Sequence, residues 1–202
     1  MKCSIVDIHT HRPTGKALEP SFAGIHPWQA ETRRIEEIVP RFGEVDLVGE
    51  IGLDYAGTVG REAQLRIFRE QLDWAERLGK PVVLHCVKAF EAVMRELAPH
   101  ALRAVIFHGF IGSSQQAAEA IKKGYYLSFG ERTFRSPRTV EALRRTPVEN
   151  LFAETDESDV PIEEIYRRIA QAKDLDPELL KCAIYRLSLI HISEPTRHLR
   201  IS

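Results

Sequence analysis

Short apolar runs alternate along this chain with stretches in which apolar residues recur at helical spacing. Near-continuous apolar runs of this length are typical of parallel strands that are covered on both faces. The alternation therefore predicts an α/β fold built from successive strand and helix units. Seven runs are predicted to be buried strands, at residues 4–8, 22–25, 46–49, 81–84, 104–107, 125–129 and 151–153.

Helix signals fill the stretches between these runs. Apolar residues recur at helical spacing from residue 65 to 78, and Gly79 follows as a stop signal. Two further helices are predicted over residues 89–97 and 113–124. The alternation fits either a (β/α) barrel of the TIM type or a doubly wound sheet, and the pattern alone does not choose. Two later helix starts carry a capping residue followed by proline, Ser136-Pro137 and Asp176-Pro177.

Composition narrows the class of protein. The chain has 202 residues, of which 44% are hydrophobic, so one globular domain is expected. Twenty-eight basic and 29 acidic residues give a net charge of -1, so bulk charge indicates no large basic surface for nucleic acid. No apolar run approaches the roughly 18 residues of a membrane span, and the N-terminus lacks a signal peptide pattern. We expect a cytoplasmic protein without a membrane or an obligate protein partner.

The three cysteines, Cys3, Cys86 and Cys182, are scattered and form no CxxC pair, so reduced thiols are predicted. The C-terminus has a different signal. Residues 187–197 resemble the translated read-through of a transposon-type sequencing adapter. We therefore predict a single domain over residues 1–186, a non-native tail over 187–202, and a terminal helix that is cut short. The histidines of this tail, His191 and His198, are discounted as ligands.

The strongest local signal for chemistry is the pair His9 and His11 at the end of the first run. In an extended segment, side chains two residues apart lie on the same side. Two imidazoles placed in this way can bind one transition-metal ion. Two exposed loop histidines also occur by chance, so this pair alone leaves both interpretations open.

Four other runs each end in a residue that can bind a metal. In a barrel, the C-terminal ends of the strands converge on one mouth, and charged groups are rarely buried unpaired in a core. The sequence thus predicts a metal site at that mouth. Its six predicted ligands are His9, His11, Glu50, His85, His108 and Asp156.

Six ligands exceed what one zinc ion needs, and the carboxylate of Glu50 can bridge two ions. We therefore predict two divalent metal ions, Mg, Mn or Zn, which together activate water for a hydrolysis. Glu50 and Asp156 are the predicted catalytic residues, with Asp156 either orienting or deprotonating the attacking water.

The motifs around these residues resemble the TatD family of metal-dependent hydrolases. This resemblance implies a distorted and compact TIM barrel, the six metal ligands named above, hydrolysis of ester bonds, and deoxyribonuclease activity. The matching segments are Asp7–His11, Gly24–Pro27, Gly49–Tyr55, Val83–Cys86, Phe107–Phe110, Tyr126–Gly130 and Glu154–Asp156.

The resemblance also implies two substrate-binding residues, His26 and Lys88. His26 would line the substrate side of the pocket, although a turn histidine fixed by the following proline is an equal alternative. Lys88 would contact a phosphate as a point charge, and its alternative is a solvated lysine at a helix start. The two tryptophans, Trp28 and Trp74, are predicted to pack, and for Trp28, which lies beside His26, the alternative is an aromatic wall for a base.

Two departures from the family pattern affect the expected substrate. The stretch Arg12–Ser21 is too short for a full first helix, and Glu157-Ser158-Asp159 adds negative charge beside the site. The leading hypothesis is a phosphodiesterase that acts on strand ends or single strands of DNA, which need fewer phosphate contacts than duplex binding. The alternatives keep the site: a binuclear-metal hydrolase of small esters or amides, or a catalytically silent metal-binding protein.

Overall fold

A computed structural model describes residues 3–193 of the chain. It contains one sheet of six parallel strands that neighbour each other in chain order. A doubly wound sheet would reverse its order at a switch point, so the sequential order supports the barrel-type fold. The strands are β1 (Phe22–Ala23), β2 (Leu47–Asp54), β3 (Val82–Val87), β4 (Val105–Phe107), β5 (Tyr126–Phe129) and β6 (Leu151–Ala153).

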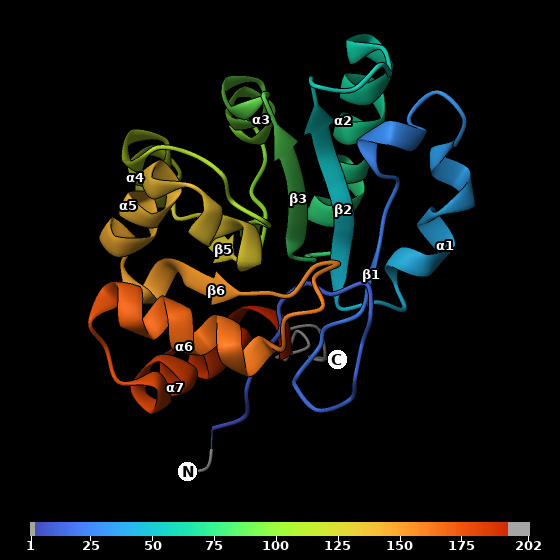
Figure 1. Ribbon diagram of the computed structural model, residues 1–202. Coiled ribbons are helices and arrows are strands. Elements are labelled where there is room, and N and C mark those ends of the chain that lie inside the picture. Colours follow the sequence, from blue (N-terminus) through green and yellow to red (C-terminus); the bar gives the residue numbers. More distant parts are fainter. Residues whose placement is uncertain (1–2, 194–202) are drawn as a thin grey trace.

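The α-helices follow one another around the outside of the strands (Figure 1). The two predicted caps are confirmed, because the side chains of Ser136 and Asp176 each accept a backbone N–H of the first helical turn, and Ser113 caps α4 in the same way. Two helices, α1 and α6, were not predicted from the sequence. The helices are α1 (Val39–Phe42), α2 (Arg61–Arg77), α3 (Phe90–Leu97), α4 (Ser114–Lys122), α5 (Pro137–Arg145), α6 (Ile162–Lys173) and α7 (Pro177–Ser188).

The first predicted strand, residues 4–8, is not a regular strand. Within it, Val6 forms an isolated bridge to Leu18, and just beyond it Thr10 forms another to Asp156. The backbone N–H of Ile8 also donates to the carbonyl of Ala153 in β6, at 3.0 Å. Bends at residues 8–9 and 11–12 interrupt the extended backbone on both sides of Thr10, so no longer ladder forms. This N-terminal segment, residues 4–11, nevertheless lies between β6 and the stretch that leads into β1.

A disulfide joins Cys3 to Cys182 of α7, with 5.1 Å between the two Cα atoms. The prediction of reduced thiols is therefore wrong for these two residues, and only Cys86 is a free thiol. The paired cysteines are 179 residues apart in the chain, so their meeting depends on the fold and leaves no local spacing signal.

The C-terminal part of the described chain continues past the predicted boundary at residue 186. Helix α7 runs to Ser188, and a π-helical turn follows over Leu189–Ser193. Ile192 is buried, and His191 Nε2 lies 2.6 Å from the hydroxyl of Tyr126. Residues 194–202, with His198, lie outside the described residues, and the non-native origin of the tail stays a prediction. Within residues 3–193, no helix is long and apolar enough to span a bilayer.

Helix α2 fixes two strand ends beside the cluster of predicted ligands. The buried amide of Gln71 accepts the N–H of Ile25 at 2.6 Å and donates to the same residue's carbonyl at 3.1 Å. Gln64 clamps Asp54 in the same way, at 2.7 and 2.9 Å. A buried amide that satisfies both backbone groups of one residue holds that residue in place. The two glutamines thus position His26, next to Ile25, and the end of β2.

Candidate metal centre

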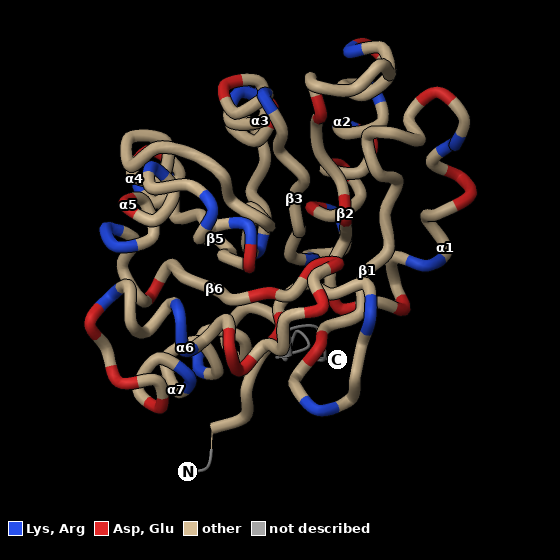
Figure 2. The backbone as a smooth tube through the Cα atoms, in the orientation of Figure 1, with Lys and Arg blue, Asp and Glu red and all other residues tan. Residues whose placement is uncertain are grey.

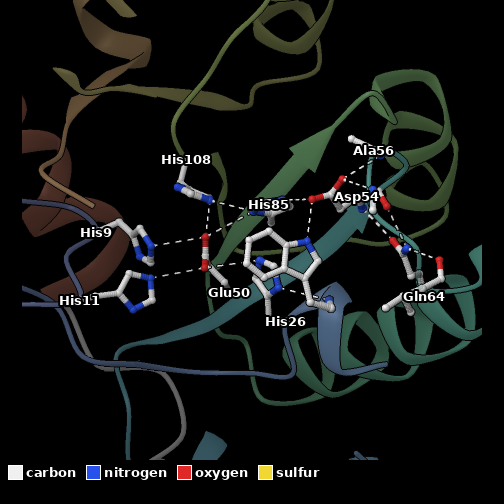
Figure 3. A network of polar contacts seen from close by, with 12 residues as sticks. His9, His11, His26, Glu50, Asp54, Ala56, Gln64, His85 and His108 are labelled. Atoms are coloured by element: carbon white, nitrogen blue, oxygen red, sulfur yellow. Dashed lines mark hydrogen bonds and ion pairs between the residues drawn. The ribbon is translucent and has the colours of Figure 1, made fainter. Parts of the chain in front are cut away.

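The structure brings the six predicted ligands together at the C-terminal mouth of the strands. Figure 3 shows the histidine side chains pointing toward Glu50 from different elements. Two predicted strand ends need correction, because β2 continues through Glu50 to Asp54 and β3 continues through His85 to Val87. The ligands come from the N-terminal segment (His9, His11), β2 (Glu50), β3 (His85), the residue after β4 (His108) and the stretch after β6 (Asp156).

Glu50 lies at an irregularity of β2. Between the pairings of Val48 and Ile51 with β3, strand β2 has one more residue than its neighbour. Such a bulge turns a side chain away from the regular alternation. Gly52 follows with φ of 139°, and a Cβ there would lie 2.0 Å from the backbone oxygen of His85. Glycine is therefore required for the close approach of β2 and β3 beside two ligands.

A first group of predicted ligands, His9, His11 and Asp156, lies beside the Glu50 carboxylate, with His9 at Oε1 and His11 at Oε2. His9 Nε2 lies 3.5 Å from Glu50 Oε1 and 3.8 Å from Asp156 Oδ1. His11 Nε2 lies 3.5 Å from Glu50 Oε2 and 3.7 Å from Asp156 Oδ1. Ligand atoms held about 2.1 Å from one tetrahedral ion lie about 3.4 Å apart. The spacing therefore fits a shared metal ion.

The His9 ring provides a separate test of that fit. It is fully buried, yet neither ring nitrogen has a hydrogen-bond partner. Burying a polar group without a partner costs free energy. A metal ion bound to Nε2 would satisfy the nitrogen that faces Glu50 and Asp156, so the residues present fit a divalent cation.

A second group consists of His85 and His108, each backed by a carboxylate. His85 Nε2 lies 3.2 Å from Asp54 Oδ2, and His108 Nδ1 faces Glu154 Oε1 at 3.4 Å. With a metal ion bound, the nitrogen that faces Asp54 or Glu154 would carry the ring proton, and the other nitrogen would bind the ion. Those other nitrogens, His85 Nδ1 and His108 Nε2, are 3.4 Å apart and both face Glu50 Oε1.

The electrostatics of the cluster are those of a cation site. Burial raises the pKa of the Glu50 carboxyl, but hydrogen bonds from His108 and the other imidazoles outweigh it and hold the pKa well below its ordinary value. Burial, together with the charge of Glu154, raises the pKa of Asp156. Carboxylates collected at one buried place repel one another unless a positive charge lies between them.

The His26 side chain is a neutral imidazole whose proton position is fixed by a hydrogen bond. Its Nδ1 accepts the backbone N–H of Trp28 at 3.2 Å, so the neutral ring carries its proton on Nε2. Burial and the neighbouring His85 lower the pKa of His26 to about 4, which keeps the ring neutral. Its Nε2 lies 3.8 Å from Glu50 Oε2. His26 therefore presents an N–H to the site rather than a lone pair for a metal ion.

The end of β6 is held in register with the N-terminal segment. Asp7 accepts the backbone N–H of Thr155 at 2.9 Å and its hydroxyl at 2.6 Å. The N–H of Asp156 donates to the carbonyl of His9, and the N–H of His11 donates to the carbonyl of Asp156. These bonds place three predicted ligands, which are far apart in sequence, on one rim.

A cavity of about 440 Å³ lies over the cluster, with His26 in its wall. Two arginines that were not predicted from the sequence, Arg41 and Arg132, also line it. Lys88 is exposed and lines a neighbouring cavity of about 300 Å³, which shares His108 with the first. The structure thus brings His26, but not Lys88, into the main cavity.

Sequence reasoning also missed the carboxylates behind the predicted ligands, Asp54 and Glu154, although both lie within the motifs that carry the family resemblance.

Trp28 was predicted to pack, but 62% of its surface is exposed, so that prediction is wrong. Trp74 is partly buried against the core, as predicted. An exposed tryptophan looks the same as a buried one in a hydropathy pattern, and only the fold separates them.

The chain is similar to known proteins in sequence and in fold. Residues 16–188 match the model of the family described as TatD related DNase. The chain belongs to this family. Among TatD relatives, the metal-dependent hydrolase YjjV of Escherichia coli K12 is 33% identical over 157 residues, which are 71% of this chain and 61% of that protein. The 3'-5' ssDNA/RNA exonuclease TatD of Citrobacter koseri is 33% identical over 149 residues, 67% of this chain and 56% of that protein.

The chain thus spans about three fifths or less of the length of these two relatives. Two solved structures of TatD proteins share the fold. The crystal structure of YjjV from E. coli has a TM-score of 0.78 at 24% identity and covers 88% of this chain and 78% of that one. A TatD family hydrolase from Entamoeba histolytica has a TM-score of 0.75 at 18% identity, covering 88% and 75%.

Proposed function

We propose that this chain is a divalent-metal-dependent phosphodiesterase that cleaves DNA. The observation that carries the proposal is the Glu50 carboxylate, which lies between two adjoining groups of side chains that can bind metals, with His9 and His108 both at Oε1. One ion would be held by His9, His11, Glu50 and Asp156, and a second by Glu50, His85 and His108. Bound ions would act as Lewis acids toward a phosphate oxygen and the attacking water.

The chain's own side chains would divide the remaining work. Asp156 lies at the rim with 22% of its side chain exposed, so it can reach water as well as an ion. It would orient the attacking water and accept its proton. His26, with its N–H on Nε2, would donate to a phosphate oxygen. Arg132 would contribute a positive charge at the cavity wall, and Lys88 would reach a phosphate in the neighbouring cavity.

Strand ends or single strands are the proposed form of the DNA. Lysines and arginines are scattered over the molecule rather than gathered on one face (Figure 2). Duplex binding needs many phosphate contacts, whereas a strand end held by a few terminal nucleotides needs few. The name of the Citrobacter koseri relative, a 3'-5' ssDNA/RNA exonuclease, supports the same substrate class.

A second candidate function is hydrolysis of a small ester or amide by the same site. The cavity of about 440 Å³ favours it, because pockets for small molecules usually measure about 300–1,000 Å³. In that case the substrate would lie wholly within the cavity, and no polymer would extend from it.

The test is a hydrolysis assay with manganese-loaded protein on end-labelled single-stranded and duplex DNA and on a panel of small esters. The proposal predicts progressive shortening of the single strand, with loss of activity in Asp156→Asn. The loss is interpretable when that variant is folded and its metal content is measured. Hydrolysis of the small esters alone would favour the second candidate. A folded, metal-loaded protein that cleaves nothing would contradict both and leave a silent metal-binding protein.

A further inference from the structure

Trp28 is an unusual side chain for a solvent-facing wall. Among the described residues 3–193, it is the one aromatic in the group of exposed large hydrophobic side chains, with 62% of its surface exposed. It lies on a 3₁₀ turn, Pro27–Gln29, and lines the main cavity over the predicted ligands. An indole left exposed beside a site offers apolar area that a ligand can cover.

The Trp28 ring is also held in a fixed place. Its Nε1–H donates to Asp54 Oδ2 at 2.7 Å, and its backbone N–H donates to His26 Nδ1 at 3.2 Å. The His26 ring packs against it edge to face, with 4.6 Å between the centroids. Asp54 is itself buried and accepts the backbone N–H of Ala56 at 2.9 Å. A group fixed before binding loses little conformational entropy when a ligand covers it.

The same Asp54 oxygen that accepts the indole N–H lies 3.2 Å from His85 Nε2. The tryptophan and a predicted metal ligand are therefore joined through one buried oxygen, with 6.0 Å between their ring centroids. A phosphate at the ligand cluster would place its own nucleoside, and not a distant one, beside the indole.

We propose that Trp28 is a stacking platform for the base of the nucleotide next to the scissile phosphodiester. This inference rests on the proposed function and adds to it a residue that selects the substrate. Every nucleobase has an aromatic face, so stacking accepts any base, while an ester without an aromatic group gains nothing from it. Trp28 would thus favour nucleotides over small esters in a cavity that is large enough for both.

Fluorescence tests the contact without catalysis. The chain has two tryptophans, so Trp74→Phe leaves Trp28 as the only indole reporter. The probes are dAMP and deoxyribose 5-phosphate, titrated into this variant with binding followed in parallel by equilibrium dialysis. The proposal predicts that dAMP quenches the emission and deoxyribose 5-phosphate does not. Binding of dAMP without quenching, equal quenching by both probes, or no binding of dAMP at millimolar concentration would overturn it.

Cleavage kinetics tests whether stacking on Trp28 favours substrates that carry a base. The substrates are two single-stranded oligonucleotides that differ only in the terminal residue, which is either an ordinary nucleotide or an abasic one. Loss of one stacked base predicts about tenfold lower kcat/KM for the abasic end with the parent protein. Trp28→Leu should cleave both at the same rate, whereas Trp28→Phe, which keeps an aromatic face, should keep the preference within about threefold.

Leu179→Ala is the matched control, because Leu179 is 68% exposed on α7 and lies outside the cavity lining. It should retain the full preference for the ordinary end. A parent that cleaves both ends equally well would refute the stacking role and leave the proposed function intact. A parent that cleaves neither would count against the proposed function, and the fluorescence titration would then decide the stacking role by itself.

Discussion

The predicted ligands come from two regions of the molecule that are held in different ways. Glu50 and His85 lie on β2 and β3, which pair in a ladder that runs to the ends of both strands. His9 and His11 lie on the N-terminal segment, which has only isolated bridges to its neighbours. Both regions deliver side chains to the same carboxylate, so regular pairing is not what the site requires.

Other contacts replace the missing ladder on the N-terminal side. The hydroxyl of Tyr166 donates to the carbonyl of Val6 at 2.9 Å, and Asp7 binds both polar groups of Thr155. The Cys3 disulfide anchors the same segment to α7. A region held by a few side-chain bonds can open locally at a lower free energy than a central sheet. We therefore expect substitutions in the N-terminal segment and substitutions in β2 and β3 to have different effects on stability and activity.

The largest expected effect comes from Glu50, the residue that the two regions share. Glu50→Gln removes the charge between both ligand groups, so metal binding should fall at both places. Since changes to residues that only support ligands already cost about 10–100-fold, activity should fall by more than about 100-fold. The hydrolysis assay with end-labelled single-stranded DNA measures this. Activity within a factor of ten of the parent would show that Glu50 does not connect the two groups.

The next largest effect is expected from a substitution that weakens only the N-terminal segment. Cys182→Ser removes the cross-link and should lower the free energy of unfolding by about 2–4 kcal/mol, because the unfolded chain gains freedom. In thermal melting this is a decrease of about 4–16 °C for a domain of this size. A reductant should lower the melting temperature of the parent and leave that of the variant unchanged. Equal melting of parent and variant would show that the disulfide does not stabilise this region.

A third substitution tests the other region, the paired strands β2 and β3. Gly52→Ala would place a Cβ against the backbone oxygen of His85 at a positive φ, which should cost about 2–3 kcal/mol of unfolding free energy. Gly43→Ala is the control, since Gly43 has a φ of -71° and nothing within 4 Å of an added Cβ. Its stability should change by less than about 1 kcal/mol. Chemical denaturation measures both, and equal midpoints would contradict the close approach of β2 and β3.

The smallest expected effect is at Asp7. In Asp7→Asn, one carboxylate oxygen that accepts from Thr155 becomes an amide NH₂, which leaves a buried donor without its acceptor. The expected cost is about 1–2 kcal/mol. Asp174→Asn is the control, because Asp174 is exposed and already has the positive φ that asparagine tolerates. If both variants unfold at the same denaturant concentration, the Asp7 contact does not hold the segment.

The same contrast explains how far the sequence could predict the structure. The end of β4 was predicted correctly, because its apolar run stops beside the polar residue His108. The end of β3 was not, because that strand continues through His85 to Val87. The first run has the same apolar pattern, but whether it forms a ladder depends on its neighbours, which lie far along the chain. Cys3 with Cys182, and Asp7 with Thr155, are likewise long-range partners with no local spacing signal.

Within the candidate site, the sequence indicated side chains that bind metals but not those that orient them. In the sequence, Asp54 and Glu154 cannot be told apart from acidic residues on the surface. Their role depends on the fold, which places them against His85 and His108. For Trp28 the sequence favoured packing over a wall for a base, because exposure depends on the fold and leaves no signal in the sequence. His26 could be separated from the ligands only by the hydrogen bond that fixes its proton.

The most direct test of the central claim is the metal content of the folded protein, measured by elemental analysis after loading with manganese or zinc. The account predicts two equivalents in the parent. It predicts one equivalent both in the His9→Ala/His11→Ala double variant and in His85→Ala, with folding checked by circular dichroism. A folded parent that binds no metal, or a double variant that still binds two equivalents, would contradict a two-ion centre around Glu50.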